Sequence, residues 1–171
     1  MKASWNAALN KVSWLIELLV DCHPQGFDVL LGEVPPPSPA EVHAMMDALR
    51  SGEVCDWQPV SPSRVAEAER IVWDVEKFDQ AVSMAHGWPH ITLVSQEYKE
   101  ADPRLWAVVM DHARFVGTAT TRHISRLGYV AARYGLAPNT VMKYRREFPI
   151  TLGKAILVYP SDSDSFQLLP G

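Results

Sequence analysis

The sequence predicts a mainly α-helical protein folded as a multi-helix bundle, and three observations carry this prediction. A capping residue followed by proline occurs repeatedly, which is typical of helix starts. After these starts, apolar residues recur at helical spacing. Towards the C-terminus a glycine separates two such segments and predicts two helices joined by a tight turn. The 171 residues suffice for one compact domain or two small ones.

The N-terminal part, residues 1–31, is predicted to hold one long helix over residues 3–21. Its apolar side chains recur on one face, which makes this helix a candidate dimerisation surface. The residues of that face are Trp5, Leu9, Val12, Ile16 and Leu19. The next stretch, residues 32–39, contains four prolines and is predicted to be an extended linker. A proline-rich docking ligand is the alternative for this stretch.

Residues 40–100 form a predicted acidic helical region. Its first helix begins with Ser38 and Pro39, where Glu41 completes a capping box, and ends at Gly52. Apolar residues at helical spacing predict its buried face. They are Val42, Met45, Met46 and Leu49.

Two further helices have starts of the same kind. One begins at Ser61 and the other at Asp102, each followed by proline, and Gly117 lies past the end of the second. On the first, Arg70 and Asp74 lie one turn apart and are expected to pair. The apolar residues are Val65, Ile71, Val72, Val75, Phe78 and Val82 on the first helix, and Leu105, Val108, Val109 and His112 on the second.

Three other segments are assigned from local composition. Residues 87–97 fit two structures, because Pro89 suits the first turn of a helix while the β-branched residues after it suit a strand equally well. Residues 155–159 are predicted to form a short extended segment. Residues 161–171 alternate serine and aspartate at their start and are expected to form a mobile tail.

The C-terminal part, residues 101–160, is predicted to be a basic domain. Between Arg104 and Lys154, nine Lys and Arg residues stand against two acids, Asp111 and Glu147, a local balance of +7. The remaining chain has seven bases and eighteen acids, a balance of −11, and the two sum to −4. Such a split is typical of a nucleic-acid-binding module.

A helix-turn-helix is predicted over residues 129–148. Ala131 provides the small side chain that closely crossing helices need, and Gly135 provides the tolerance of positive φ that the turn needs. Pro138 fits the first turn of the second helix, where a missing N–H costs nothing. The apolar residues under the second helix are Leu136, Val141 and Tyr144.

The side chains that face outward from the second helix indicate DNA binding. Asn139, Thr140 and Lys143 lie near the start of the second helix, where a recognition helix in the major groove contacts base edges. Arginines of the same region are the candidate phosphate contacts. They are Arg145, Arg146, Arg122, Arg126 and Arg133.

The segment resembles the helix-turn-helix of bacterial and phage DNA-binding proteins. The matching residues are Ala131, Gly135, Leu136, Thr140 and Val141. It is also similar to the promoter-reading C-terminal domain of sigma factors and to the sigma-like domains of small phage regulators. In those domains a preceding helix, here over residues 103–116, completes the unit. The resemblance covers residues 129–148 well and residues 103–148 loosely.

The segment departs from that pattern at two places. Ala137 occupies the N-cap of the second helix, where many such motifs carry Ser or Thr, and losing that cap costs about 1 kcal/mol. Residues 121–134 are longer than the usual first helix, so they form either one long helix or a helix that Gly128 interrupts.

Charge and resemblance together imply sequence-specific binding of double-stranded DNA by a phage or bacterial transcriptional regulator. The expected partners are DNA, a second copy bound through residues 3–21, and RNA polymerase or another protein bound through the acidic part. A DNA-packaging or recombination accessory is one alternative. A protein-interaction module built on a helix-turn-helix is the other.

Other chemistries lack a matching pattern. Neither a phosphate-cradling glycine loop nor a local nucleophile motif occurs, so we expect no enzyme and no cofactor. His86 and His90 have the spacing of a helical metal site, but residues 87–89 disfavour a continuous helix between them, and no metal is expected. Cys22 and Cys55 are expected to be reduced thiols in the cytoplasm. No apolar run approaches the roughly 20 residues of a membrane helix.

Overall fold

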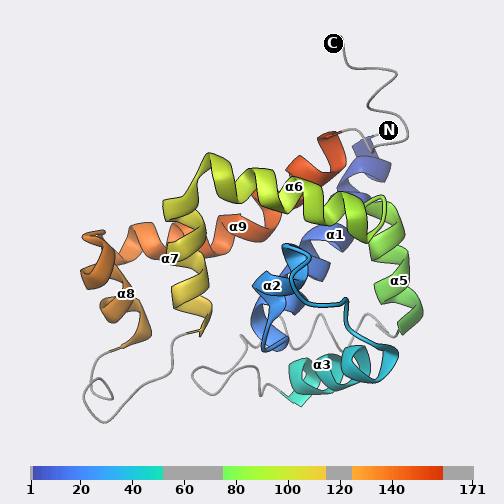
Figure 1. Cartoon of the computed structure of the whole chain (residues 1–171), viewed down its shortest axis with the longest axis horizontal. Coiled ribbons are helices and arrows are strands. Elements are labelled where there is room, and N and C mark those ends of the chain that lie inside the picture. The colour runs from blue at the N-terminus through green and yellow to red at the C-terminus, as the bar shows by residue number, and fades with distance from the viewer. Residues whose placement is uncertain (1, 52–74, 115–124, 160–171) are drawn as a thin grey trace.

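The computed structural model describes residues 2–51, 75–114 and 125–159, and within these ranges the chain is mainly helical (Figure 1). The predicted fold class is confirmed: the described residues form eight helices and no strand. The helices are α1 (Lys2–Cys22), α2 (Gly26–Leu30), α3 (Pro39–Ser51), α5 (Val75–Met84), α6 (Trp88–Ala101), α7 (Pro103–Arg114), α8 (Arg126–Tyr134) and α9 (Pro138–Val158).

Helices α1 and α9 lie side by side at the centre of the bundle and run antiparallel (Figure 1). Gly153, late in α9, lies against Leu9 and Ser13 of α1. Arg145, earlier in α9, bonds Asp21 near the end of α1. The other helices surround this pair: α2, α3 and α5 pack on α1, while α6, α7 and α8 pack on α9.

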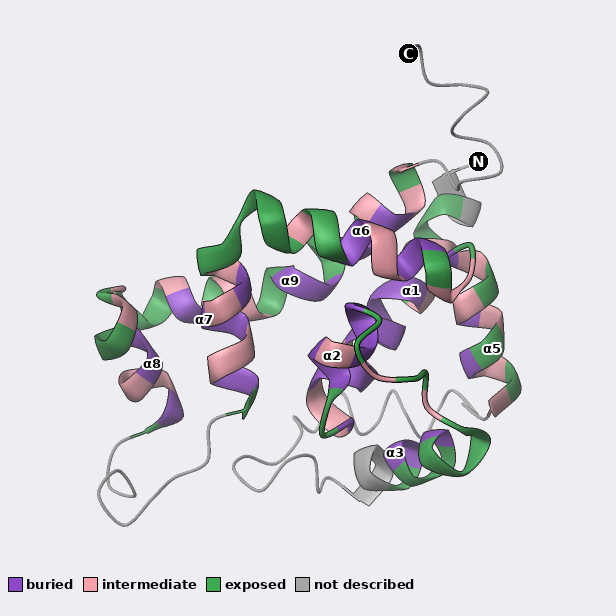
Figure 2. Cartoon of the chain, viewed as in Figure 1, coloured by how far each residue is buried: buried purple, intermediate pink, exposed green. Residues whose placement is uncertain are grey.

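The main core lies between these helices, and the buried face of α1 forms its centre (Figure 2). Three residues of the α1 face predicted from the sequence, Val12, Ile16 and Leu19, are fully buried. They are therefore not available to a second copy in this fold. Trp5, at the start of α1, is 38% exposed.

An aromatic cluster joins four helices in this core. Phe27 of α2, Trp106 of α7 and Phe148 of α9 are each about 1% exposed, and their ring centroids lie 5.4–5.8 Å apart. Tyr98 of α6 packs edge-on against Phe148 at 5.8 Å. Burial is the main cause of the raised pKa of the Tyr98 hydroxyl, and the negative charges of Asp102 and Glu147 raise this pKa further.

Helix α9 corrects the prediction of an extended segment at residues 155–159. The helix continues through Pro149 to Val158 and bends along its length in Figure 1, as prolines inside helices cause. An interior proline costs roughly 3 kcal/mol. Phe148, Leu152 and Ile156 recur on one face and are buried in the core, each worth roughly 1.5–3 kcal/mol. Burial in the main core therefore outweighs the cost of Pro149.

Helix α6 settles the ambiguous segment 87–97 in favour of a helix. Gly87 precedes α6 with φ 90°, and Pro89 occupies its first turn. The residues that α6 buries follow helical spacing rather than the alternation of a strand. They are His90, Ile91, Val94 and Ser95.

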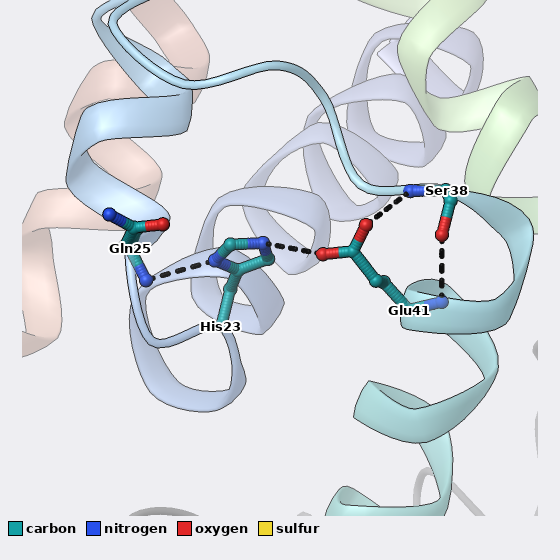
Figure 3. Close-up of polar contacts among 4 residues, drawn as sticks. All are labelled: His23, Gln25, Ser38 and Glu41. Atoms are coloured by element: carbon teal, nitrogen blue, oxygen red, sulfur yellow. Dashed lines mark hydrogen bonds and ion pairs between the residues drawn. The ribbon is translucent and has the colours of Figure 1, made fainter.

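The predicted capping box at the start of α3 is confirmed (Figure 3). The Glu41 backbone N–H donates to Ser38 Oγ, and the Ser38 N–H donates to Glu41 Oε1, both at 3.2 Å. The hydrogen bond from the Ser38 N–H, followed by one from the Ser38 side chain, lowers the pKa of the Glu41 carboxyl. Its other oxygen lies 3.5 Å from His23 Nε2, while His23 Nδ1 accepts the Gln25 N–H at 2.9 Å. The end of the proline-rich stretch is thus tied to the end of α1.

Several predicted features fall outside the described residues. They are the helix start at Ser61, the pair Arg70 and Asp74, the helix ends at Gly52 and Gly117, Arg122, Cys55 and the tail 161–171. The boundaries predicted between the N-terminal, acidic and basic parts stay predictions.

Candidate nucleic-acid interface

A small second core holds α7, α8 and the first half of α9 together. Its centre is formed by Val108 of α7, Val130 and Ala131 of α8, and Val141 of α9, which are 0–4% exposed. Tyr144 of α9 packs against both this core and the main one. Ala131 occupies the buried position expected of the small residue, whereas Ala132 is exposed. The preceding helix expected over residues 103–116 is present as α7.

The turn between α8 and α9 has the conformation predicted for it. Gly135 adopts φ 64° and ψ 34°, and the Leu136 N–H donates to the Ala131 carbonyl at 2.9 Å. A Cβ at Gly135 would meet nothing within 4 Å, so the backbone conformation rather than space favours glycine here. The two predicted helices and their turn are present. Their use as a DNA-binding unit stays a prediction.

The starts of α8 and α9 differ in their caps. Ser125 precedes α8, and its Oγ accepts the Gly128 N–H at 2.9 Å. Within the described residues the helix therefore starts at Arg126, and Gly128 lies in its first turn without interrupting it. Sequence reasoning missed this cap, although a serine before a helix start is the usual signal. Ala137 precedes α9 without a side-chain cap, as predicted, and Pro138 follows.

Three of the predicted DNA contacts form an exposed stripe on the first half of α9. Asn139, Lys143 and Arg146 are all exposed, and their spacing places them on one helix face. Thr140 beside them is half-buried. Ile150, 45% exposed, continues the same face. This set, Asn139, Lys143 and Arg146, is called the reading stripe below.

Two of the predicted phosphate contacts point into the protein instead. The side chain of Arg145 is 12% exposed and bonds Asp21 of α1. Arg126 is 7% exposed and donates to the Ala113 carbonyl at 3.4 Å. Both cations lie near His112. Burial of this imidazole, and second these two positive charges, lower its pKa to about 3. The structure thus separates Arg126 and Arg145 from the reading stripe.

Two exposed arginines meet at the end of α8. Arg133 is 56% exposed, lies 3.7 Å from the Asp111 carboxylate and stacks over the Tyr134 ring at 5.7 Å. Arg104, at the start of α7, is exposed and donates to the Tyr134 carbonyl. Tyr134 in turn donates its hydroxyl to Asp111. Arg104 belongs to the basic stretch but was not predicted as a contact, because its approach to α8 depends on the tertiary fold.

In the ranges that the structure describes, no three His, Cys, Asp or Glu residues are placed so that they could hold a metal ion. His86 has φ 67° and precedes α6, so His86 and His90 do not share one helix. Their rings meet edge to face at 5.2 Å, and His90 Nε2 lies 2.8 Å from the Ile156 carbonyl. His90 thus serves to join α6 to α9. Across the described helices, none has the length and apolarity needed to cross a bilayer.

Comparison of the chain with protein-family models, with curated proteins and with solved structures gave no match. A functional proposal therefore rests on the residues of the interface itself.

Proposed function

We propose that this chain binds double-stranded DNA in a sequence-specific manner and acts as a transcriptional regulator of phage or bacterial type. The observation that carries the proposal is the reading stripe. An amide and two cations are exposed on the first half of α9, directly after a tight turn, while Val141 on another face of the helix is buried in the small core. A recognition helix must combine an outward polar face with a fixed inward face.

The chemistry of the stripe suits base edges and phosphates. Asn139 can accept from and donate to an adenine edge in the major groove, and Lys143 can donate to guanine. Arg146, one turn further along, can bind guanine or phosphate in a bidentate manner. Arg133, at the end of α8, and Arg104, which contacts that end from α7, are proposed to bind phosphate beside the groove. Arg126 is left out of this contact set because it is buried, and Arg145 because its half-buried side chain is paired with Asp21.

A single recognition helix makes a small footprint, so we propose that a second copy or a partner protein completes the complex on DNA. The acidic part of the chain that precedes the basic domain, residues 1–100, is the proposed surface for RNA polymerase or another protein. Its negative charge also repels DNA and limits nonspecific binding.

The test is selection of the full chain on random duplex DNA, followed by a salt titration on the enriched site. We expect an enriched motif whose log Kd depends steeply on log salt, because bound cations release counterions. A palindromic motif would indicate a dimer. Enrichment of no motif would contradict the proposal and would favour a protein-interaction module. Salt-dependent binding without sequence preference would favour a packaging accessory.

A matched pair of variants assigns that binding to the reading stripe. Lys143→Gln with Arg146→Gln removes two cations from the first half of α9, and we expect it to weaken binding and to reduce the salt slope by about one, because Arg146 is the phosphate contact of the two and Lys143 donates to a base. Lys154→Gln is the control, because Lys154 is exposed on the second half of the same helix, about 12 Å beyond Arg146. Equal effects of both changes would contradict the assignment.

A further inference from the structure

One ion pair connects the first half of α9 to α1. Arg145 Nη2 donates to Asp21 Oδ1, and the two side chains are only 12% and 25% exposed. The residues are separated by 124 positions in the chain. Arg145 precedes Arg146 of the reading stripe in the chain, so its side chain leaves α9 about 100° around the helix from that of Arg146.

The pair belongs to a larger polar junction of four helices. His112 of α7, which is 4% exposed, interacts with the charges of both Arg145 of α9 and Arg126 of α8. Arg126 also reaches the carbonyl of Ala113, the residue after His112. Asp21 of α1 brings a negative charge to Arg145. The junction therefore lies where the main core meets the small core of α7, α8 and α9.

A half-buried cation with a carboxylate partner is costly to move. Withdrawal of Arg145 towards a phosphate would leave Asp21 without this partner and would open the contact between α1 and α9. A partly buried, charge-assisted bond also holds its helices in one orientation more firmly than an exposed pair does.

We propose that Asp21 and Arg145 are positioning residues for DNA binding: their ion pair fixes the reading stripe relative to α1 and holds Arg145 away from DNA. This inference rests on the proposed function. It assigns Arg145 a role unlike that of its neighbour Arg146, although the two are alike in the sequence.

A comparison of salt slopes tests the assignment. Arg146→Gln is expected to reduce the slope of log Kd against log salt by about one, the value for one lost phosphate contact. Arg145→Gln is expected to weaken binding at every salt concentration by about 2- to 30-fold, a range typical of indirect coupling, and to leave the slope unchanged. A slope reduced by about one in Arg145→Gln would overturn the proposal.

A double-mutant cycle on DNA affinity tests the partnership. We expect Asp21→Asn to weaken binding about as much as Arg145→Gln, and the double variant to be no weaker than either single one. Arg145→Lys is expected to restore part of the affinity because it keeps the charge. Independent, additive losses would overturn the proposal, as would tighter binding by Asp21→Asn, which would mean that the pair withholds a phosphate contact without positioning the helix.

A second readout separates this inference from the proposed function. If the unaltered chain enriches no DNA site, the proposed function fails, and the same cycle is then measured on urea unfolding of the full chain. Non-additive losses of stability would still support a pair that orients α9 on α1. Additive losses would overturn it. Where Asp21→Asn does not fold, Asp21→Glu is measured in its place: affinity and stability close to those of the unaltered chain would support the pair, and a loss as large as that of Arg145→Gln would overturn it.

Discussion

His112 shows how single buried residues shape the behaviour of this protein. The imidazole is 4% exposed in α7, close to the cations Arg126 and Arg145. Burial first, and then these charges, disfavour the imidazolium form and lower the pKa to about 3. The folded protein therefore keeps His112 neutral at pH values at which a histidine in the unfolded chain is already protonated.

We predict that His112 makes stability fall with acidity between about pH 6.5 and pH 3. In this window the unfolded chain binds a proton that the folded chain does not, so the free energy of unfolding decreases by up to roughly 1.4 kcal/mol per pH unit. Below about pH 3 both states are protonated and this contribution levels off. Urea unfolding across this pH range, compared with the neutral variant His112→Gln, measures it. Parallel pH curves for the two proteins would contradict the prediction.

The starts of several helices are fixed by local capping residues. Ser38 and Asp102 accept backbone N–H groups at the positions predicted, since capping is a local interaction within four residues. Ser125 follows the same rule at α8. Ala137, before α9, makes no side-chain cap hydrogen bond, although its φ of −68° and ψ of 144° are those of a capping residue.

We predict that Ala137→Ser stabilises the protein by up to about 1 kcal/mol, because the new hydroxyl can accept an orphan N–H in the first turn of α9. The converse change, Ser125→Ala, is expected to destabilise it by about 1 kcal/mol. Both follow from urea unfolding midpoints at unchanged m-values. A destabilising Ala137→Ser would show that the exposed start of α9 lacks the geometry of an N-cap.

The contact between α1 and α9 holds the molecule together. A Cβ on Gly153 would lie 2.9 Å from Ser13 Oγ and 3.4 Å from Leu9 Cδ1, so the two helices approach closely at this point. Ser13 Oγ is itself buried and has no hydrogen-bond partner among the described residues. Glycine in α9 is therefore explained by packing, against a helix propensity that favours alanine by roughly 1 kcal/mol.

We predict that Gly153→Ala destabilises the protein by about 1–3 kcal/mol through overpacking, despite its better helix propensity. Ser13→Ala in the same chain removes the nearest clashing atom and is expected to recover most of that loss. Thermal unfolding of the two single variants and the double variant measures the coupling. A stabilising Gly153→Ala on its own would contradict the close packing of α1 on α9.

Local features of this fold were predictable from the sequence, and features that depend on distant partners were not. Glycine at the α8–α9 turn, the capping box at Ser38 and the apolar face of α1 follow from short-range geometry. The continuation of α9 through Pro149 depends on burial in the main core, which no local pattern shows. Likewise Arg145 and Arg146 are indistinguishable until Asp21, far away in the chain, is placed beside one of them.

The most direct measurement of the central claim is repetition of the DNA selection with Asn139→Ala. An exposed asparagine that reads a base should, when removed, relax the preference at one position of the enriched motif, at a cost of roughly 1–3 kcal/mol in discrimination, and leave the other positions intact. That result would establish that the first half of α9 reads DNA. An enriched motif identical to that of the unaltered chain would contradict the account, because base reading would then lie elsewhere.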